Sequence, residues 1–324
     1  MRKIITIILC ISILLSSSLV SMAYTPQDSV KILRSLGVIQ GDPNGDLREN
    51  DLVKRSEFSK MAVLLSEYKN KLSLNSKISV FTDCTAEHWA APYVRVAAEN
   101  GIIEGYSNGL FGPDDCISYA QAVTIALRLL GYTDADFGYT YPEGQLGMAQ
   151  SLKLGDGLFK EADDLLSRLD VAIIFKNMLL TNKKGTNTNY IESLDYKIKE
   201  DTVIVATNDE ESSVAPGKVF TTSGEYTIDN SFDKSLIGYK GSAIVDSEGK
   251  LLTLIKTPGS AVRYSVTTAG SDFVSLTGAK GNLALDCDDG TLSYIGTQKT
   301  NFASLKTSVS VGDVVIVGKD GNGI

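Results

Sequence analysis

A short stretch that occurs twice decides the fold of the first half of the chain: Gly37-Val38-Ile39-Gln40-Gly41 and Gly101-Ile102-Ile103-Glu104-Gly105. The two copies lie 64 positions apart, and Arg55 and Tyr119 keep the same offset. A third, shortened copy contains Leu154-Gly155-Asp156-Gly157-Leu158-Phe159. Repeats of this length are typical of proteins that stack copies of one supersecondary unit. The sequence therefore predicts three copies between about residues 25 and 181.

Each copy is expected to fold as a helix, a glycine-rich loop and a second helix. In the second helices, apolar residues recur at three- and four-residue spacing. They are Phe58, Met61, Ala62, Leu65 and Tyr68; Val123, Ala126, Leu127 and Leu130; and Val171, Ile174, Phe175, Met178 and Leu179. One short helix cannot bury such a stripe alone, so the copies are predicted to pack as a compact helical trimer.

The loops of the three copies contain Gly45, Gly109 and Gly157 beside Asp or Asn residues. Calcium loops need alternating acidic ligands and a terminal glutamate, which are missing here. We therefore expect tight turns in which these glycines adopt positive φ.

Residues 1–23 are predicted to be a secretory signal peptide. Arg2 and Lys3 precede an apolar run from Ile4 to Leu15, and Ser21-Met22-Ala23 has the small-x-small pattern of a cleavage site. The apolar run is shorter than the roughly 20 residues that a membrane-spanning helix needs. No later run is long enough, so no membrane span is expected after cleavage.

The composition excludes several classes of protein. Once Arg2 and Lys3 are removed, 29 basic residues face 39 acidic ones, and this acidic balance disfavours nucleic-acid binding. The single histidine, His88, excludes most hydrolytic triads and histidine-rich metal sites, so neither a metal site nor a cofactor is predicted. Cys84 and Cys116 either pair as a disulfide or stay free, and Cys287 has no obvious partner.

The second half has a different pattern. The polar segment 182–198 is predicted to be a linker, and short β-strands separated by turn residues follow it. The strands are expected at 202–206, 242–245, 251–255, 273–276 and 314–317, with a hairpin turn at 246–250. This predicts an all-β domain over 199–324, built as small barrels or a sandwich, either as one unit or as two subdomains, 199–258 and 262–324. The whole chain is thus an α+β multidomain protein.

The last predicted strand, Val314-Val315-Ile316-Val317, is followed by turn residues but by no second strand. An unpaired strand at a sheet edge is a template for another chain. We therefore expect either a truncated form of a longer surface protein or an edge that a neighbouring subunit completes. No catalytic motif occurs in this half, which favours a structural or adhesive role over an enzyme.

The second copy resembles the S-layer homology repeat. The resemblance is carried by Phe81-Thr82-Asp83, His88-Trp89-Ala90, Tyr93-Val94, Ala97-Ala98, Gly101-Ile102-Ile103-Glu104-Gly105-Tyr106, Gly109, Phe111 and Pro113. The first copy lacks the Phe-x-Asp and Trp residues, and the third is shortened. The resemblance implies tandem repeats over 24–74, 79–133 and 137–181 that form a three-pronged pseudo-threefold module. It also implies binding to pyruvylated secondary polymers attached to peptidoglycan.

The family's Thr-Arg-Ala-Glu signature begins the second helix of a repeat. Its counterparts here are Lys54-Arg55-Ser56-Glu57, Ser118-Tyr119-Ala120-Gln121 and Ser167-Arg168-Leu169-Asp170. A hydroxyl followed three residues later by an acid or amide is a capping box. We therefore expect caps from Ser118 with Gln121 and Ser167 with Asp170, whereas Glu57 lacks a hydroxyl partner and Asp51 is the alternative cap.

The resemblance assigns ligand binding to the second position of each signature. An arginine beside a helix N-terminus, where exposed amides favour an anion, can bind a carboxylate through two parallel hydrogen bonds. Arg55 and Arg168 are predicted to bind the polymer in this way, with Lys54 beside them. Tyr119 brings no charge and would stack on a sugar or donate one hydrogen bond. The alternative for each arginine is a solvated helix-start residue.

Trp89 and His88 complete the candidates. Trp89 would either stack against a sugar face or anchor its loop by burying its indole ring. His88 has no second ligand-type residue at metal-binding spacing, so a loop hydrogen bond is expected.

The function predicted from the sequence is non-covalent anchoring of a secreted protein to the wall of a bacterium. The predicted partners are the wall polymer and other copies of the chain in a surface lattice. The alternatives are a wall-anchored polysaccharide hydrolase and an adhesin, in which the β-rich half is the effector.

Overall fold

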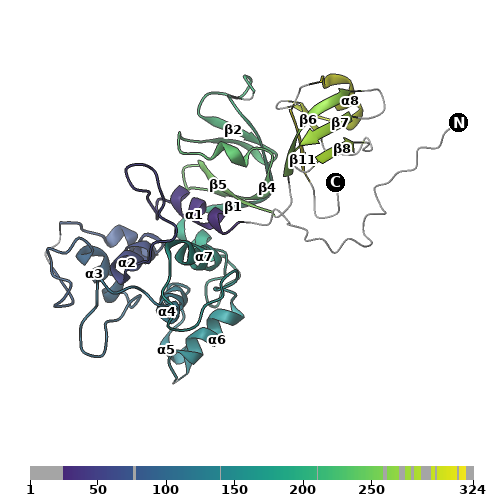
Figure 1. Ribbon diagram of the computed structural model, residues 1–324. Coiled ribbons are helices and arrows are strands. Elements are labelled where there is room, and N and C mark those ends of the chain that lie inside the picture. Colours follow the sequence, from purple (N-terminus) through teal and green to yellow (C-terminus); the bar gives the residue numbers. More distant parts are fainter. Residues whose placement is uncertain are drawn as a thin grey trace, which may run out of the picture.

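The chain forms a helical module followed by antiparallel sheets (Figure 1). The computed structural model describes residues 25–257 apart from 76–77, 139 and 210. Beyond these, it describes 261–269, 274–278, 281–285, 293–295, 298–311 and 314–318. The predicted signal peptide and Cys287 lie outside the described residues.

The helical module consists of three helix–loop–helix segments. They are α1 (Pro26–Ser35) with α2 (Arg55–Leu64), α3 (Ala91–Glu99) with α4 (Tyr119–Leu129), and α6 (Glu143–Ser151) with α7 (Arg168–Leu179). Short elements fill the connections: η1 (Glu67–Lys71) and α5 (Asp134–Phe137). The predicted apolar stripes of α2, α4 and α7 all contribute to one buried core, in which the Phe58 and Phe175 rings stack 4.7 Å apart.

The residues just before α2, α4 and α7 form a closed ring of backbone hydrogen bonds. The Val53 N–H donates to the Leu166 carbonyl (2.9 Å), the Leu166 N–H to the Ile117 carbonyl (3.1 Å), and the Ile117 N–H to the Val53 carbonyl (2.9 Å). All three side chains are fully buried. This ring brings the N-termini of the three helices together, which places the three candidate tetrapeptides around one point.

The segment 182–198, which the sequence predicts to be a linker, is packed against the helical module. It contains η2 (Tyr190–Leu194), in which Tyr190, Ile191 and Leu194 are buried in the helical core. The Tyr190 hydroxyl donates to the Leu65 carbonyl at 3.0 Å. The chain therefore reaches the first sheet through a packed connection.

The first sheet has the order β3-β2-β1-β4-β5. Its strands are β1 (Lys197–Thr207), β2 (Lys218–Thr221), β3 (Gly224–Thr227), β4 (Lys240–Val245) and β5 (Leu251–Lys256), with η3 (Lys234–Leu236) before β4. The predicted hairpin is confirmed, because β4 pairs with β5 and the Asp246 N–H donates to the Lys250 carbonyl (3.0 Å). A bridge between Thr227 and Lys250 brings the end of β3 to the start of β5, so the sheet is curled.

The second sheet has the order β11-β6-β7-β8. Its strands are β6 (Ala261–Ala269), β7 (Val274–Gly278), β8 (Gly281–Leu285) and β11 (Val314–Gly318), and β9 (Ser293–Ile295) pairs with β10 (Gln298–Thr300). Its connections repeat those of the first sheet, since β6, like β1, pairs with the next strand and with a later one.

Two predictions for this half were wrong. It is not all-β, because α8 (Phe302–Ser308) lies between β10 and β11, and its N-cap Asn301 accepts a hydrogen bond from the Ser304 N–H at 2.8 Å. The chain as a whole is mixed α+β. The strand predicted to lack a partner is also paired, because β11 aligns with β6 within the chain from Val314 to Gly318.

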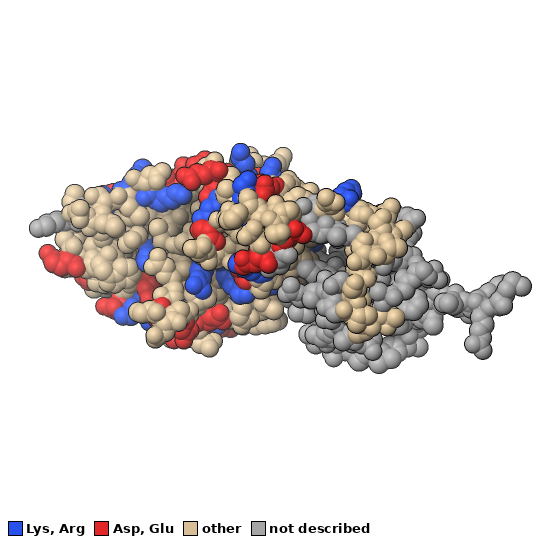
Figure 2. Space-filling view, turned by 90° about the horizontal axis from the view of Figure 1, so that it is seen from above, with Lys and Arg blue, Asp and Glu red and all other residues tan. Residues whose placement is uncertain are grey.

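Within the described residues, no helix is both long and apolar enough to cross a membrane. On the face shown in Figure 2, the basic and acidic side chains of the described residues are interspersed.

Candidate functional site

The starts of α4 and α7 are capped as their sequences predict. Ser118 Oγ accepts from the Gln121 N–H (3.4 Å), and Gln121 Oε1 accepts in return from the Ser118 N–H (3.3 Å). Ser167 Oγ accepts from the Asp170 N–H (3.2 Å), and Asp170 Oδ2 accepts from the Ser167 N–H (2.9 Å). Each cap satisfies backbone amides that have no partner inside the helix.

The cap of α2 is Lys54 and not Asp51. The Lys54 N–H donates to Glu57 Oε2 at 2.9 Å, which is the acidic half of a capping box. Asp51 Oδ2 instead accepts from the guanidinium of Arg48, at 2.6 Å from Nη2 and 2.7 Å from Nε. The exposed Lys54 ammonium forms an ion pair with Asp114 at 2.7 Å.

Arg55 is buried at the start of α2 and holds the loop of the next segment. Its Nε donates to the Phe111 carbonyl (2.8 Å) and its Nη2 to the Glu104 carbonyl (3.1 Å). The guanidinium also lies 4.6 Å from the Tyr106 ring centre and 4.8 Å from that of Phe111. Only 6% of the residue is exposed, and this burial lowers the pKa of the guanidinium.

Arg168 makes the equivalent contacts at the start of α7. Its Nε donates to the Leu47 carbonyl (2.9 Å) and its Nη2 to the Gln40 carbonyl (3.0 Å), 64 positions before the carbonyls that Arg55 contacts. Leu47 stands where the other loop has Phe111, and no aromatic ring is found over this guanidinium among the described residues. Arg168 is half-buried and so remains more accessible than Arg55.

Neither of these two arginines forms an ion pair with an acidic side chain in the described part of the chain, although the carboxylates of Asp115 and Asp83 act on Arg55 without a direct contact. The arginines that form ion pairs there are Arg48, Arg95 and Arg128. Carbonyl groups orient Arg55 and Arg168 without cancelling their charge. Each guanidinium therefore lies beside a helix N-terminus without an acidic ion-pair partner among the described residues, which is an environment that favours an anion.

Tyr119 occupies the same position at the start of α4. Its half-buried side chain reaches the loop of the third segment, where a Cβ atom added to Gly155 would lie 2.1 Å from the Tyr119 hydroxyl oxygen. Burial raises the pKa of this phenol. The start of α4 is thus closed by a neutral aromatic side chain.

Trp89 is exposed and does not anchor its loop by burial. The residue is 52% exposed. The centre of its ring lies 5.8 Å from the ring centre of His88 and 6.4 Å from that of Tyr93. His88 Nδ1 accepts from the Ala90 N–H at 3.1 Å, which is the loop hydrogen bond expected for this residue. Of the two interpretations of Trp89, the geometry favours an exposed stacking surface.

Asp114 pairs with Lys54 at the start of α2. The pKa of Asp114 is lowered first by its hydrogen bond to Lys54 and by the charge of that lysine, and in smaller part by His88.

The loops behave as predicted: Gly45, Gly109 and Gly157 adopt φ values of 86°, 82° and 92°. Asp83 fixes the second loop, because its carboxylate accepts from the backbone N–H groups of Phe111 (2.9 Å) and Gly112 (2.7 Å). Desolvation acts to raise the pKa of Asp83, but these backbone hydrogen bonds outweigh it and the pKa is lowered. The Phe-x-Asp motif could have suggested this role.

Of the two alternatives that the sequence left open for Cys84 and Cys116, the structure has both thiols free. Cys84 is buried, which raises its pKa to about 11, whereas Cys116 forms a backbone bridge with Lys54 at the helix starts. Among the described residues, no cluster of three or more His, Cys, Asp or Glu side chains could hold a metal ion.

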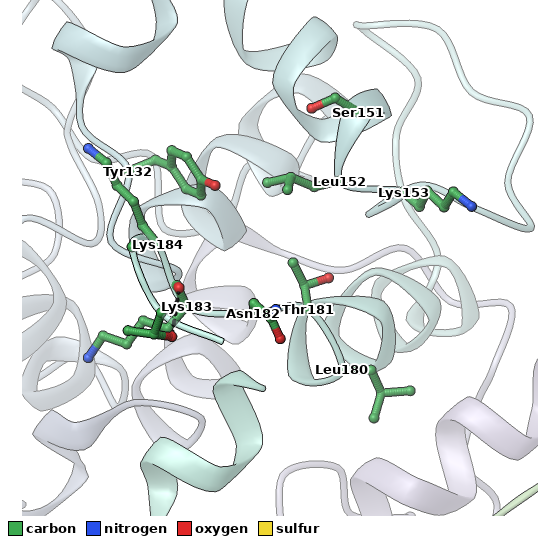
Figure 3. A pocket seen from close by; sticks show the side chains of 11 residues that line it. Tyr132, Ser151, Leu152, Lys153, Leu180, Thr181, Asn182, Lys183 and Lys184 are labelled. Carbon is green, nitrogen blue, oxygen red and sulfur yellow. Dashed lines mark hydrogen bonds between the residues drawn. The ribbon is translucent and has the colours of Figure 1, made fainter. Parts of the chain in front are cut away.

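A hollow of about 420 Å³ lies at the opposite ends of the helices, after α4, α6 and α7 (Figure 3). Lys153, Lys183 and Lys184 line it, but the ammonium groups of Lys153 and Lys183 point to opposite sides. Lys183 pairs with Glu67 (3.3 Å) and Lys184 with Asp136 (2.6 Å). The hollow therefore does not concentrate positive charge as the helix starts do.

Comparison with known proteins identifies the central part of the module. Residues 80–123, which span α3, its loop and the start of α4, match the S-layer homology domain. This segment is an S-layer homology domain. It contains Asp83, Trp89 and Tyr119, and the flanking segments lie outside the match.

Longer alignments relate the chain to bacterial surface proteins. It is 31% identical over 184 residues to a cell surface protein of Thermoanaerobacter kivui, covering 55% of this chain and 21% of that protein. It is 29% identical over 132 residues to a surface layer protein of Brevibacillus choshinensis, covering 41% of this chain and 12% of that protein. An amylopullulanase of Thermoanaerobacterium thermosulfurigenes is 30% identical over 108 residues, covering 32% of this chain and 6% of the enzyme. The chain thus spans between 6% and 21% of the length of these relatives.

Proposed function

We propose that the helical module of this secreted cell-surface protein anchors it, without a covalent bond, to an anionic polymer of the bacterial cell wall. The S-layer homology domain at residues 80–123 and the similarity to surface-layer proteins support this assignment. In this proposal the ligand is a pyruvylated secondary polymer attached to peptidoglycan, and the β-rich half is a structural part of a surface layer in which other copies of the chain are neighbours.

The three helix–loop–helix segments act as three tandem repeats around a pseudo-threefold axis. The closed hydrogen-bond ring of Val53, Ile117 and Leu166 supports this arrangement, since each residue makes the same contact with the next. The equivalent carbonyl contacts of Arg55 and Arg168 support it independently.

The observation that carries the proposal is the uncompensated charge of Arg168. Its guanidinium is half-buried, is oriented by two carbonyl groups and lies at the N-terminus of α7. A ketal-linked pyruvate offers a carboxylate, which would accept charge-assisted hydrogen bonds from the remaining N–H groups of the guanidinium. Arg55, at 6% exposure, serves mainly to fix its neighbouring loop and adds to the positive potential.

The exposed residues around the helix starts recognise the sugar. Trp89 presents an indole face on which a pyranose ring can stack, and Lys54 with Asp114 supplies polar groups at the start of α2. Tyr119 contributes a contact without charge, so the sites differ in strength.

A wall-anchored polysaccharide hydrolase is the second candidate, favoured by the partial similarity to an amylopullulanase. An adhesin, in which the β-rich half binds a further partner, would use the same anchor. Hydrolysis of wall or storage polysaccharides by the full chain would establish the first of these alternatives.

Cosedimentation with purified cell walls tests the anchoring site. Arg168→Ala is expected to weaken binding by about 1.5 to 3 kcal/mol, which is at least tenfold, because a charge-assisted contact is lost. The matched control is Arg34→Ala, which removes one positive charge from an exposed position on α1. Equal binding by the two variants would show that Arg168 does not contact the polymer.

A further inference from the structure

Helix α1 lies between α7 and the first sheet (Figure 1). The buried core of the helical module includes Ile244 of β4. Ile198, Leu252 and Ile255 from β1 and β5 pack against the same core. One face of the sheet is therefore part of the helical core, and not only its neighbour.

The remainder of the sheet has a core of its own. It consists of seven buried residues, with Tyr226, Ile228, Ile237 and Tyr239 packed around them: Ile204, Val219, Phe232, Leu236, Ala243, Leu251 and Leu254. The sheet thus joins two clusters, one shared with the helices and one inside its curl.

A largely buried ion pair connects α1 to β5, and we call this contact region the joint. Asp28 Oδ1 lies 2.8 Å from Lys256 Nζ, and the two side chains are only 9% and 20% exposed. The other carboxylate oxygen of Asp28 accepts from the Thr25 N–H at 2.9 Å, as part of the capping box that starts α1. A second ion pair joins Lys31 to Asp233 at 3.0 Å. Asp28, which belongs to the capping box of α1, also pairs with Lys256 of β5, so α1 and the sheet are stabilised together.

The connection after α7 is equally fixed. Tyr190 donates its backbone N–H to the Thr181 carbonyl (2.8 Å) and its hydroxyl to the Leu65 carbonyl (3.0 Å), while Ile191 is fully buried. The chain therefore enters β1 from the core of the helical module.

We infer that the helical module and the first sheet, β1 to β5, form one cooperative folding unit joined through α1. The wall anchor consequently holds the sheet in a fixed orientation and not on a flexible tether. This inference goes beyond the proposed function and stands on contacts that polymer binding does not involve, so either can fail without the other.

Hydrogen exchange of the full chain, read by mass spectrometry, tests the coupling. Leu254→Ala perturbs a residue that belongs only to the sheet's own core. If the unit is cooperative, amides in α7 and in β4 lose protection by the same factor, because both exchange through the same global opening. A loss confined to the strands, with α7 unchanged, would overturn the inference. The milder Ile204→Val serves if Leu254→Ala does not fold.

Asp28→Asn tests the joint itself. The amide oxygen can still accept from the Thr25 N–H, but Lys256 is left charged and unpaired in a largely buried position. The expected result is a fall of at least tenfold in the protection of both α1 and β5. The matched control is Lys218→Met, which breaks an exposed ion pair with Glu225 on β2 and β3. If Asp28→Asn changes the protection of α1 and β5 no more than this control does, the role of α1 as the joint is contradicted.

Discussion

Arg55→Ala is predicted to destabilise the helical module more than any other single change at the helix starts. The substitution removes hydrogen bonds to the carbonyls of Phe111 and Glu104 and the contacts with the rings of Tyr106 and Phe111. Hydrogen bonds from a charged group contribute about 1.5 to 3 kcal/mol each, and a desolvated cation–π contact about 1 to 2 kcal/mol. Because these contacts form one network, their sum is an upper bound, and we expect a loss of about 3 to 5 kcal/mol.

Urea denaturation followed by circular dichroism and by the fluorescence of Trp89, the single tryptophan, measures this loss. Arg168→Ala is the matched comparison, because it removes two equivalent hydrogen bonds from a more exposed residue, over which no described residue places an aromatic ring. Its cost should be smaller, about 1 to 3 kcal/mol. If Arg55→Ala costs no more than Arg168→Ala, the structural role assigned to Arg55 is refuted.

Three further outcomes are expected. Trp89→Ala should weaken wall binding in cosedimentation by about 1 kcal/mol while leaving the urea midpoint unchanged, because the side chain is half exposed; a lower midpoint would mean that the indole supports the fold. Tyr119→Arg should strengthen wall binding by adding a charge at the start of α4, and unchanged binding would show that Gly155 and its loop keep that site closed. Asp229 has a pKa lowered to about 2 by its hydrogen bonds to Lys250 and Ser231, so its stabilising effect is complete above about pH 4 and lost as the pH falls toward 2. Asp229→Asn should therefore lower the thermal midpoint at neutral pH and flatten its fall between pH 4 and 2, and a fall as steep as that of the unmodified chain would contradict this.

Local features of the sequence predicted the helix starts well. The 64-residue offset aligned Arg55 with Tyr119, and the capping boxes at Ser118 and Ser167 follow from residues three positions apart. Such signals depend on neighbours within one helical turn, which the sequence shows directly.

The partners of the arginines could not be predicted in the same way. Arg55 contacts a carbonyl 56 positions away and Arg168 one 121 positions away, and a backbone carbonyl leaves no trace in the residue type. The sequence therefore indicated the charge at the starts of α2 and α7 but not that two carbonyls orient each arginine.

The packing of the segment 182–198 was not predicted because its composition is polar. The spacing of Tyr190, Ile191 and Leu194 places apolar side chains on one side of a helical turn, and this was the available signal. α8 was missed for a similar reason: it is one short helix among strands, indicated only by the cap at Asn301.

Binding to purified walls before and after removal of the pyruvyl groups tests the central claim most directly. Mild acid hydrolysis would remove the ketal and leave the polymer on the peptidoglycan, and the full chain would then be cosedimented with both preparations. Strong binding to untreated walls and a loss of at least tenfold after treatment are expected, because the carboxylate proposed to bind Arg168 is gone. Equal binding to both preparations would contradict the account.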